Sequence, residues 1–320
     1  MLDNLLFSFN NVFPIFLVIL VGGLLRKTGM LDDDAVSKID LIVFRIALPA
    51  SLFTSITSTK IEEAFDLEFI AFVTLVTIIC FIVIWLFSGI FIKDRVISAS
   101  FVQGSFRGNY AFVGLPLIKA MFGNESSVTG KGSILAAFVI VLNNILSVIV
   151  LASGSKHQGE SGMKSLKKIC LNIFTNPLII AITVAIVFSV LHIRLPIILS
   201  TTIDYFSNLA SPLALLSIGT FLALKNTKED FIYSAAATSI KLILLPIAAI
   251  LPAIAAGFRD TDLVMLLMIF GVPTAAGAFP MAAIMGGDPK LTANIIVQTS
   301  LFSILTLTLG IFILKNLNMM

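Results

Sequence analysis

Two positively charged residues interrupt long apolar stretches of the sequence, Arg107 in "SFRGNYAFVGLP" and Lys241 in "SIKLILLP". Each lies about ten residues into its stretch, or about 15 Å deep if the stretch is a helix crossing a bilayer. A charge at that depth costs at least about 2.5–3.5 kcal/mol, so it usually has a partner or a function. The acidic residues nearest to that depth, Asp40 and Asp204, lie within about two turns of their segment ends. Two central cations without a central acid favour a negatively charged ligand.

Each cation also has a structural interpretation. Lys241 could instead bind backbone carbonyls that a helix break leaves free. Arg107 could bind a carboxylate through two parallel hydrogen bonds, or its side chain could extend toward the membrane interface. The sequence leaves both alternatives open for both residues.

Glycine and proline recur beside Arg107 and in a second segment, "PTAAGAFPMAAIMGGD". A proline within a helix removes a backbone donor and frees a carbonyl, and glycine lets the backbone open. The half-helix that follows a break presents unpaired N–H groups, which attract anions. We therefore expect Gly114, Pro116, Gly277 and Pro280 to break two helices and to form a polar site with Asn109. The alternative is a simple kink in each helix.

A third apolar segment carries the adjacent amides Asn143 and Asn144. Neighbouring residues point about 100° apart on a helix, so we expect at most one of them to face a cavity directly. Gln298 and Thr299 hold a similar place in the last segment. The alternative for all of these residues is hydrogen bonding between helices, worth about 0.6 kcal/mol on average.

Composition places these residues in a membrane. Of the 320 residues, 58% are hydrophobic and 12% are charged, whereas soluble domains carry about 25% charge. An integral membrane protein follows. The net charge is +3 and there is no basic tract, so no nucleic-acid partner is expected. The two cysteines, Cys80 and Cys170, form no CxxC motif or Cys/His cluster, so no metal and no cofactor are expected.

Ten apolar segments can be drawn, each near or above the ~20 residues that span a bilayer as a helix. They cover residues 10–25, 36–57, 68–92, 97–122, 132–153, 171–191, 197–224, 231–256, 261–286 and 291–314. The fold class is therefore an all-α polytopic membrane protein. Lysine and arginine are concentrated in the loops after the odd-numbered segments, which predicts that these loops are cytoplasmic and both termini extracytoplasmic.

The two halves of the chain resemble each other. Pro116 in the fourth segment aligns with Pro280 in the ninth, and the polar linker 154–170 separates residues 1–153 from residues 171–320. Five spans in each half would give the halves opposite orientations. Gly/Pro-interrupted segments at matching places of inverted halves indicate the binding site of a secondary transporter. Coincidence is the alternative, because glycine and proline are common in membrane helices.

The ordered motifs "LVGGLLRKTGML", "NYAFVGLPLIKAMFG", "ASPLALLSIGTFL" and "PTAAGAFPMAAIMGGD" resemble the auxin efflux carrier family over essentially the whole chain. This family includes bacterial malate and malonate permeases and the plant PIN-FORMED carriers. The resemblance implies two inverted five-helix repeats, whose broken fourth and ninth helices cross at mid-membrane and hold the substrate. It also implies a scaffold of helices 1, 2, 6 and 7 and a moving transport domain.

Carried over residue by residue, the resemblance assigns the motif asparagine to Asn109, the crossover prolines to Pro116 and Pro280, and a polar position of the fifth helix to Asn143. The chain departs from the plant carriers because it lacks their long central hydrophilic loop. Auxin itself is therefore not expected as the substrate.

The sequence predicts a secondary-active or facilitative carrier of small organic anions, such as malate or malonate, in the cell membrane. The absence of a P-loop pattern gives no sign of ATP, and the coupling ion, proton or sodium, stays open, as does a homodimer. A channel-like anion pore is the alternative. An intramembrane hydrolase is not expected, because HExxH is absent, "MGGD" fails the GxGD pattern, and His157 and His192 lie in or beside loops.

Overall fold

The computed structural model describes residue 14 and residues 17–57, 66–122, 127–154, 175–222, 228–317 and 319. Every regular element in this part of the chain is a helix, which confirms the predicted all-α class. Extended pairing is limited there to one isolated bridge, between Gly108 and Thr274. The predicted linker 154–170 lies, apart from Gly154, outside the described residues.

Four helices within the described ranges are long and apolar enough to cross a bilayer. They are Leu67–Phe91, Val128–Gly154, Asp230–Ala255 and Pro289–Asn316. Two further apolar helices, Pro177–Val190 and Thr261–Gly271, are shorter. The chain therefore contains several membrane-spanning helices.

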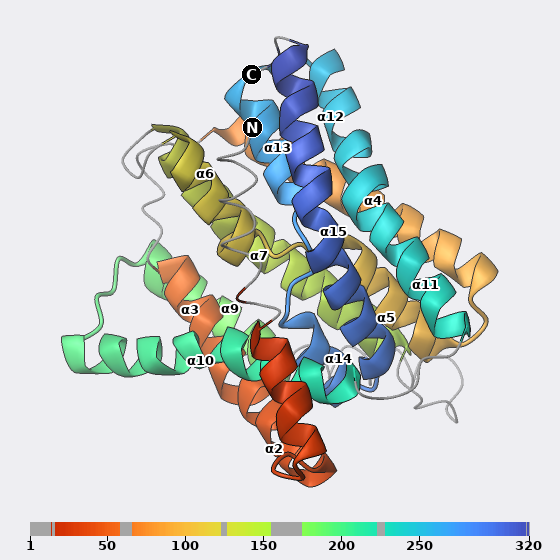
Figure 1. Cartoon of the computed structure of the whole chain (residues 1–320). Helices are drawn as coiled ribbons and strands as arrows, with labels where there is room; N and C mark the ends of the chain where they lie inside the picture. Colours follow the sequence, from red (N-terminus) through yellow and green to blue (C-terminus); the bar gives the residue numbers. More distant parts are fainter. Residues whose placement is uncertain are drawn as a thin grey trace, which may run out of the picture.

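One group of helices, red and green in Figure 1, lies at the left and bottom of the molecule. It comprises α2 (Asp33–Ile42), π-helical η1 (Val43–Ala47), α3 (Leu48–Thr57), α9 (Pro177–Val190) and α10 (Ile197–Leu222). Local sequence sets the helix starts: the carboxylate of Asp32 accepts from the N–H of Ala35, and the Asn176 amide accepts from Leu178. Helix α3 packs against both α9 and α10.

The second group occupies the top and right of Figure 1, with α6 at the upper left and α14 lower down beside the first group. Its uninterrupted helices are α4 (Leu67–Phe91), α7 (Ser127–Gly154), the continuous run α11 (Lys228–Ser239), η3 (Ile240–Leu244) and α12 (Leu245–Ala255), and α15 (Pro289–Asn316). Helix α4 has one buried face and one exposed face, both apolar: Phe69 and Phe81 are buried in the core, whereas Ile90 is 75% exposed. An apolar side chain on the outer face is expected where lipid replaces water.

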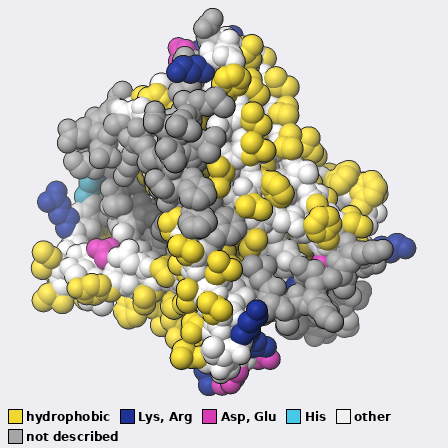
Figure 2. Space-filling view, in the orientation of Figure 1, with side chains coloured by type: hydrophobic (Ala, Val, Ile, Leu, Met, Phe, Trp, Pro, Cys, Tyr) yellow, Lys and Arg dark blue, Asp and Glu magenta, His cyan; other side chains and the backbone are white. Residues whose placement is uncertain are grey.

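The surface agrees with this interpretation. Figure 2 shows hydrophobic side chains over the flank where Figure 1 places α12 and α15, whereas lysine and arginine side chains on this face lie near the edges of the outline. An apolar body with charges toward its margins is the pattern expected of a protein that a bilayer surrounds.

Two further segments of the second group are interrupted helices. The first consists of α5 (Arg95–Phe106), π-helical η2 (Tyr110–Gly114) and α6 (Leu115–Phe122). The second consists of α13 (Thr261–Gly271) and α14 (Ala278–Met285). Their interruptions lie beside each other, because Gly108 pairs with Thr274.

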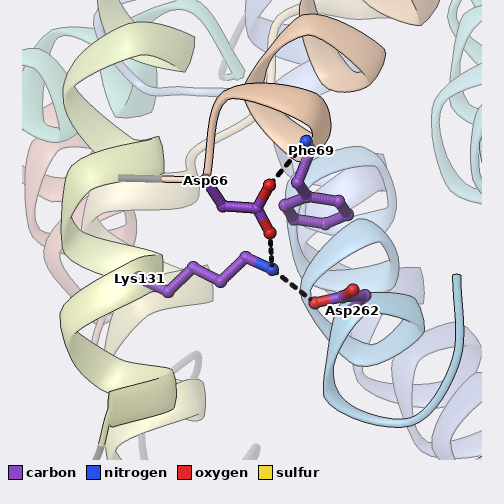
Figure 3. A network of polar contacts seen from close by, with 4 residues as sticks. All are labelled: Asp66, Phe69, Lys131 and Asp262. Carbon is purple, nitrogen blue, oxygen red and sulfur yellow. Dashed lines mark hydrogen bonds and ion pairs between the residues drawn. The ribbon is translucent and has the colours of Figure 1, made fainter. Parts of the chain in front are cut away.

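An ion-pair network joins the N-terminal ends of three helices (Figure 3). The ammonium group of Lys131, in the first turns of α7, lies 2.7 Å from carboxylate oxygens of both Asp66 and Asp262. Asp66 also accepts from the N–H of Phe69 and caps α4, and the Lys131 ammonium lies 4.3 Å from the centre of the Phe69 ring. The network therefore fixes α4, α7 and α13 at one end of the bundle.

The substitution Lys131→Gln is expected to lower the free energy of unfolding by on the order of 1 kcal/mol, because two carboxylates lose a shared cation at a partly exposed site. The hydrogen bond from Lys131 holds the pKa of Asp66 below its usual 3.8. A lowered pKa contributes stability that is present above the usual value and is lost as the pH falls through the lowered one. The difference between the two proteins should therefore shrink below pH 3.8.

Thermal unfolding of the purified protein in detergent, on both sides of that pH, measures this difference. Lys38→Gln is the matched control, because the Lys38–Asp34 pair is largely exposed and should contribute little. Equal stability of Lys131→Gln and the wild type at neutral pH would contradict a structural role for the network.

Candidate functional site

The two interruptions pair with each other through their backbones. The N–H of Asn109 donates to the carbonyl of Pro273 at 2.8 Å, and the N–H of Ala275 donates to the carbonyl of Arg107 at 3.3 Å. The Thr274 hydroxyl donates to the carbonyl of Gly104 at 2.7 Å. These bonds satisfy polar groups that the helix ends leave free, so irregular backbone is tolerated within the bundle.

The interruptions lie upstream of the places predicted from sequence. We expected Gly114 and Pro116 to break the first helix, yet both lie within the continuous helical turns of η2 and α6. The extended backbone begins at Arg107 instead, with φ −75° and ψ 106°. In η2 the N–H of Leu115 donates to Tyr110, five residues back. This wider π-helical turn accommodates the missing N–H of Pro116 without ending the helix.

The second interruption shows the same displacement. Pro280 is the third residue of α14, where a helix N–H has no partner within the helix, so a proline is tolerated. The extended backbone lies earlier, around Val272, with φ −67° and ψ 155°. Gly277 is the N-cap of α14. Both prolines thus lie within the second half-helix rather than at the break.

A cavity of about 70 Å³ lies between the paired interruptions and the first helix group. Its polar lining consists of Ser51, Arg107, Asn109, Asn143, Asn144 and Ser211, together with the backbone at Gly277. Ser51 comes from α3 and Ser211 from α10, whereas the remaining residues come from the second group. The cavity therefore lies where the two helix groups meet.

Arg107 is the cation of this cavity. The residue is buried, with only 5% of its surface exposed. One terminal N–H of its guanidinium donates to the amide oxygen of Asn144 at 2.9 Å. The other terminal nitrogen contacts the sulfur of Met281. Among the described residues no carboxylate lies within ion-pair distance of Arg107. Its buried charge is thus held by neutral groups alone.

Two amides on the cavity wall have side chains without a hydrogen-bond partner in the described part of the chain. Asn109 is 8% exposed and Asn143 is 6% exposed. Neither amide is among the fully buried, unpartnered polar atoms of the described residues, so both stay accessible to an occupant of the cavity. Because an amide both donates and accepts, these two side chains favour a polar occupant next to the Arg107 guanidinium.

Lys241 lies away from the cavity wall. It is fully buried in η3, and its ammonium donates to the carbonyl of Phe270 at 2.7 Å, in the last turn of α13. Gly108 separates it from the cavity, since a Cβ on Gly108 would lie 3.1 Å from the Lys241 nitrogen. A cation at a helix C-terminus stabilises that end, which is the structural alternative that the sequence left open.

The structure therefore brings together Arg107, Asn109, Asn143 and Gly277 of the predicted site. It places Gly114, Pro116, Pro280 and Lys241 outside the cavity lining. Sequence reasoning gave Asn144 no separate role and expected at most one of the adjacent amides at a cavity, yet both line it. The cavity is wider than one side chain, so two adjacent residues of α7 that point about 100° apart can both line it. The feature of the sequence that could have identified Asn144 is the pair of adjacent amides in an apolar segment.

Gln298 and Thr299 serve helix packing. The Gln298 amide donates to the hydroxyl of Ser234 at 2.9 Å, and the hydroxyl of Thr299 accepts from the N–H of Thr274 at 3.1 Å. The first bond joins α15 to α11, and the second holds α15 against the interruption in the α13–α14 segment. The first bond matches the alternative of hydrogen bonding between helices, and the second joins a helix to the interruption.

Comparison with known proteins agrees with the membrane-carrier features. The family described as "Membrane transport protein" matches residues 7–311. An uncharacterized transporter of Escherichia coli (strain K12), YfdV, is 25% identical over 287 residues, which are 87% of this chain and 88% of the relative. An uncharacterized transporter of Methanocaldococcus jannaschii is 25% identical over 317 residues, covering 95% of this chain and 98% of the relative.

A protein of Rhizobium meliloti (strain 1021) with the name "Putative malonate transporter" is also similar. It is 23% identical over 308 residues, which cover 95% of each chain. All three relatives have transporter names, which is consistent with the expectation that this chain is not an enzyme.

Proposed function

The chain belongs to the membrane transport protein family, that of the auxin efflux carriers, and from this premise we propose that it is a secondary-active or facilitative carrier of small organic anions. The proposed substrates are carboxylates and dicarboxylates, of which malate and malonate are the first candidates. The name of the Rhizobium meliloti relative supports malonate as a starting point.

One observation carries the choice of an anion: the buried guanidinium of Arg107 faces a cavity and has only neutral partners among the described residues. Removing one partner from a buried ion pair costs several kcal/mol, because it leaves a charge uncompensated. A bound carboxylate would supply the missing charge and could accept two parallel hydrogen bonds from the guanidinium. The free amides of Asn109 and Asn143 would bind its remaining oxygen atoms or a second polar group.

The site lies where two groups of helices meet, which supports alternating access. In this mechanism the group containing α5 and α13 moves against the group containing α3 and α10, and the cavity opens to one side and then to the other. The affinity for the substrate would then depend on residues of both helix groups, because both line the cavity. The mechanism needs no continuous pore.

Two inverted repeats, residues 1–153 and 171–320, are proposed as the architecture. Support comes from helical runs that recur in the same order, four of the five pairs at similar length. They lie at 33–57, 67–91, 95–106, 110–122 and 127–154, and at 197–222, 228–255, 261–271, 278–285 and 289–316. Further support comes from the paired interruptions. The bonds from Asn109 to Pro273 and from Ala275 to Arg107 hold the two interruptions together as an antiparallel pair at the Gly108–Thr274 bridge.

Ten spans with both termini extracytoplasmic are proposed from the charge distribution, and the ion pairs support the alternation of sides on which the spans start. Lys131 bonds to both Asp66 and Asp262. All three residues lie at the start of spans that, by the charge distribution, begin on the outer side of the membrane. Lys290 bonds to Asp230 at 2.7 Å, and both precede spans that start in the cytoplasm. A wrong parity would have put bonded residues on opposite faces of the membrane. We place the protein in the cell membrane, with a homodimer as a further proposal.

A ligand-stabilisation screen tests the proposed function. Purified protein is heated in detergent with malonate, malate, monocarboxylates or the uncharged diamide malonamide, with and without sodium and across pH. At least one carboxylate should raise the unfolding temperature, because a ligand that binds only the folded state stabilises it, and malonamide should not. A screen in which no carboxylate stabilises the protein would contradict the proposal.

Transport by the reconstituted protein separates a carrier from a channel-like pore. A carrier should show saturable uptake and counterflow of the stabilising anion in liposomes. Ohmic single-channel currents would instead support the pore. A dependence of uptake on an imposed sodium or proton gradient would identify the coupling ion.

A further inference from the structure

Asn144 contacts the charged group of the cavity directly, although Asn109 and Asn143 are the amides that the family resemblance selects. Its oxygen accepts from Arg107 at 2.9 Å, and its nitrogen donates to the carbonyl of Ile140 at 2.7 Å, one turn earlier in α7. A guanidinium has only donors and a carbonyl only accepts, so both bonds require this one orientation of the amide. The bond to Ile140 thus fixes the oxygen toward Arg107.

The second group on the Arg107 side chain is also neutral. The sulfur of Met281, from α14, contacts one terminal nitrogen of the guanidinium, while Asn144 binds the other. Gly277 lies beside the nitrogen that Asn144 binds, since a Cβ at position 277 would lie 3.4 Å from that nitrogen. The guanidinium has five N–H donors in a fixed fork, so donors remain for the cavity.

The residue type at position 144 decides whether the protein itself neutralises the charge of Arg107, because this side chain binds the guanidinium. An aspartate is nearly the same size as asparagine and would place a carboxylate oxygen within hydrogen-bond distance of Arg107. That pair would compensate the charge inside the protein, and a substrate carboxylate would then meet a neutral site. Asparagine offers the same hydrogen bond without the charge.

We propose that Asn144 is the positioning residue that makes this site selective for anions: it holds the Arg107 guanidinium at the cavity wall and leaves its positive charge for a substrate carboxylate. This inference rests on the proposed function and extends it to a residue outside the predicted site. The ligand class is a small carboxylate anion. An uncharged analogue of the same shape is not attracted by the positive charge of Arg107 and should bind more weakly.

The experiment compares Asn144→Asp with the wild type in thermal unfolding and in binding of malonate, or of another carboxylate if the screen shows one to be better. The ligand-free variant is expected to be about as stable as the wild type, because the new carboxylate pairs with Arg107 while the hydrogen bond to the Ile140 carbonyl is lost. Its affinity for the carboxylate is expected to fall by at least about 30-fold, the scale of a close charge pair. Lost affinity with retained or increased stability is a combination that a merely structural residue would not give.

Two variants sharpen the comparison. Asn143→Asp adds the same charge to the preceding residue of the same cavity wall, where no hydrogen bond to Arg107 exists. Its ligand-free form is therefore expected to be less stable than Asn144→Asp. Asn144→Gln keeps a neutral acceptor and is expected to retain measurable carboxylate binding. These variants separate charge, position and hydrogen-bonding capacity.

Each outcome decides between the hypotheses. Strong carboxylate binding by Asn144→Asp would overturn the role of Asn144 while leaving the proposed function intact. A much less stable or misfolded Asn144→Asp would also overturn it, because the proposal requires the pair with Arg107 to offset the lost hydrogen bond to Ile140. If no carboxylate binds even the wild type, the proposed function fails and the role of Asn144 fails with it.

Discussion

The substitution Arg107→Gln is expected to abolish stabilisation by carboxylates while leaving the ligand-free protein at least as stable as the wild type. The guanidinium is buried and has only neutral partners among the described residues. Its charge therefore adds nothing to the stability of the empty site, and replacing an uncompensated buried charge by a neutral group is often neutral or stabilising. The loss of affinity should exceed about 30-fold, since a close charge pair disappears.

Thermal unfolding with and without the best carboxylate measures both effects on one sample. Arg45→Gln is the matched control: Arg45 is an exposed residue in η1 that does not line the cavity, so its removal should leave the ligand response unchanged. An Arg107→Gln protein that unfolds far more easily, yet still binds the anion, would make Arg107 a structural residue.

The substitution Gly108→Ala is expected to destabilise the paired interruptions by about 1–3 kcal/mol, the usual cost of overfilling a packed core. A Cβ at this position would lie 2.9 Å from the carbonyl oxygen of Ile269, which belongs to the backbone of α13, and 3.1 Å from the Lys241 nitrogen. The backbone cannot move aside easily, so the two paired extended segments must separate or Lys241 must shift. Either response would displace Arg107 and Asn109, and transport should fall.

Gly89→Ala is the control for this prediction. Gly89 lies in α4, and a Cβ there would meet nothing within 4 Å, so alanine should be tolerated and should favour the helix slightly. Unfolding temperature and liposome uptake are measured for both variants. A Gly108→Ala protein with wild-type stability and uptake would show that the close approach at the bridge is not required.

A large part of the candidate site could be predicted from sequence alone. Arg107 and Asn109 stand out because a membrane segment is otherwise apolar, and the depth of a residue in a helix follows from its position in the segment. Membrane class and all-helical structure follow for a related reason, since composition and backbone hydrogen bonding in lipid leave few alternatives. The family resemblance then pointed to the same two segments.

The exact place of the breaks was predicted wrongly because local rules were incomplete. Pro116 and Pro280 are strong local signals, yet a proline fits a π-helical turn or the first turn of a helix without breaking it. The actual breaks lie at residues around Arg107 and Val272, where each extended segment finds backbone partners in the other. Neither segment carries that information by itself.

The sequence by itself determined that this is a helical membrane protein with a cation and several amides buried in its apolar segments. Only the tertiary structure decided which of them act together. Asn144 is 37 positions from Arg107 along the chain, and Met281 is 174 positions away, so their contacts depend on how α7 and α14 pack against the interruption. The same packing assigns Lys241 to a helix end and Arg107 to the cavity. Periodicity fixes the face of one helix, whereas the partner of a buried charge is fixed by the register between helices.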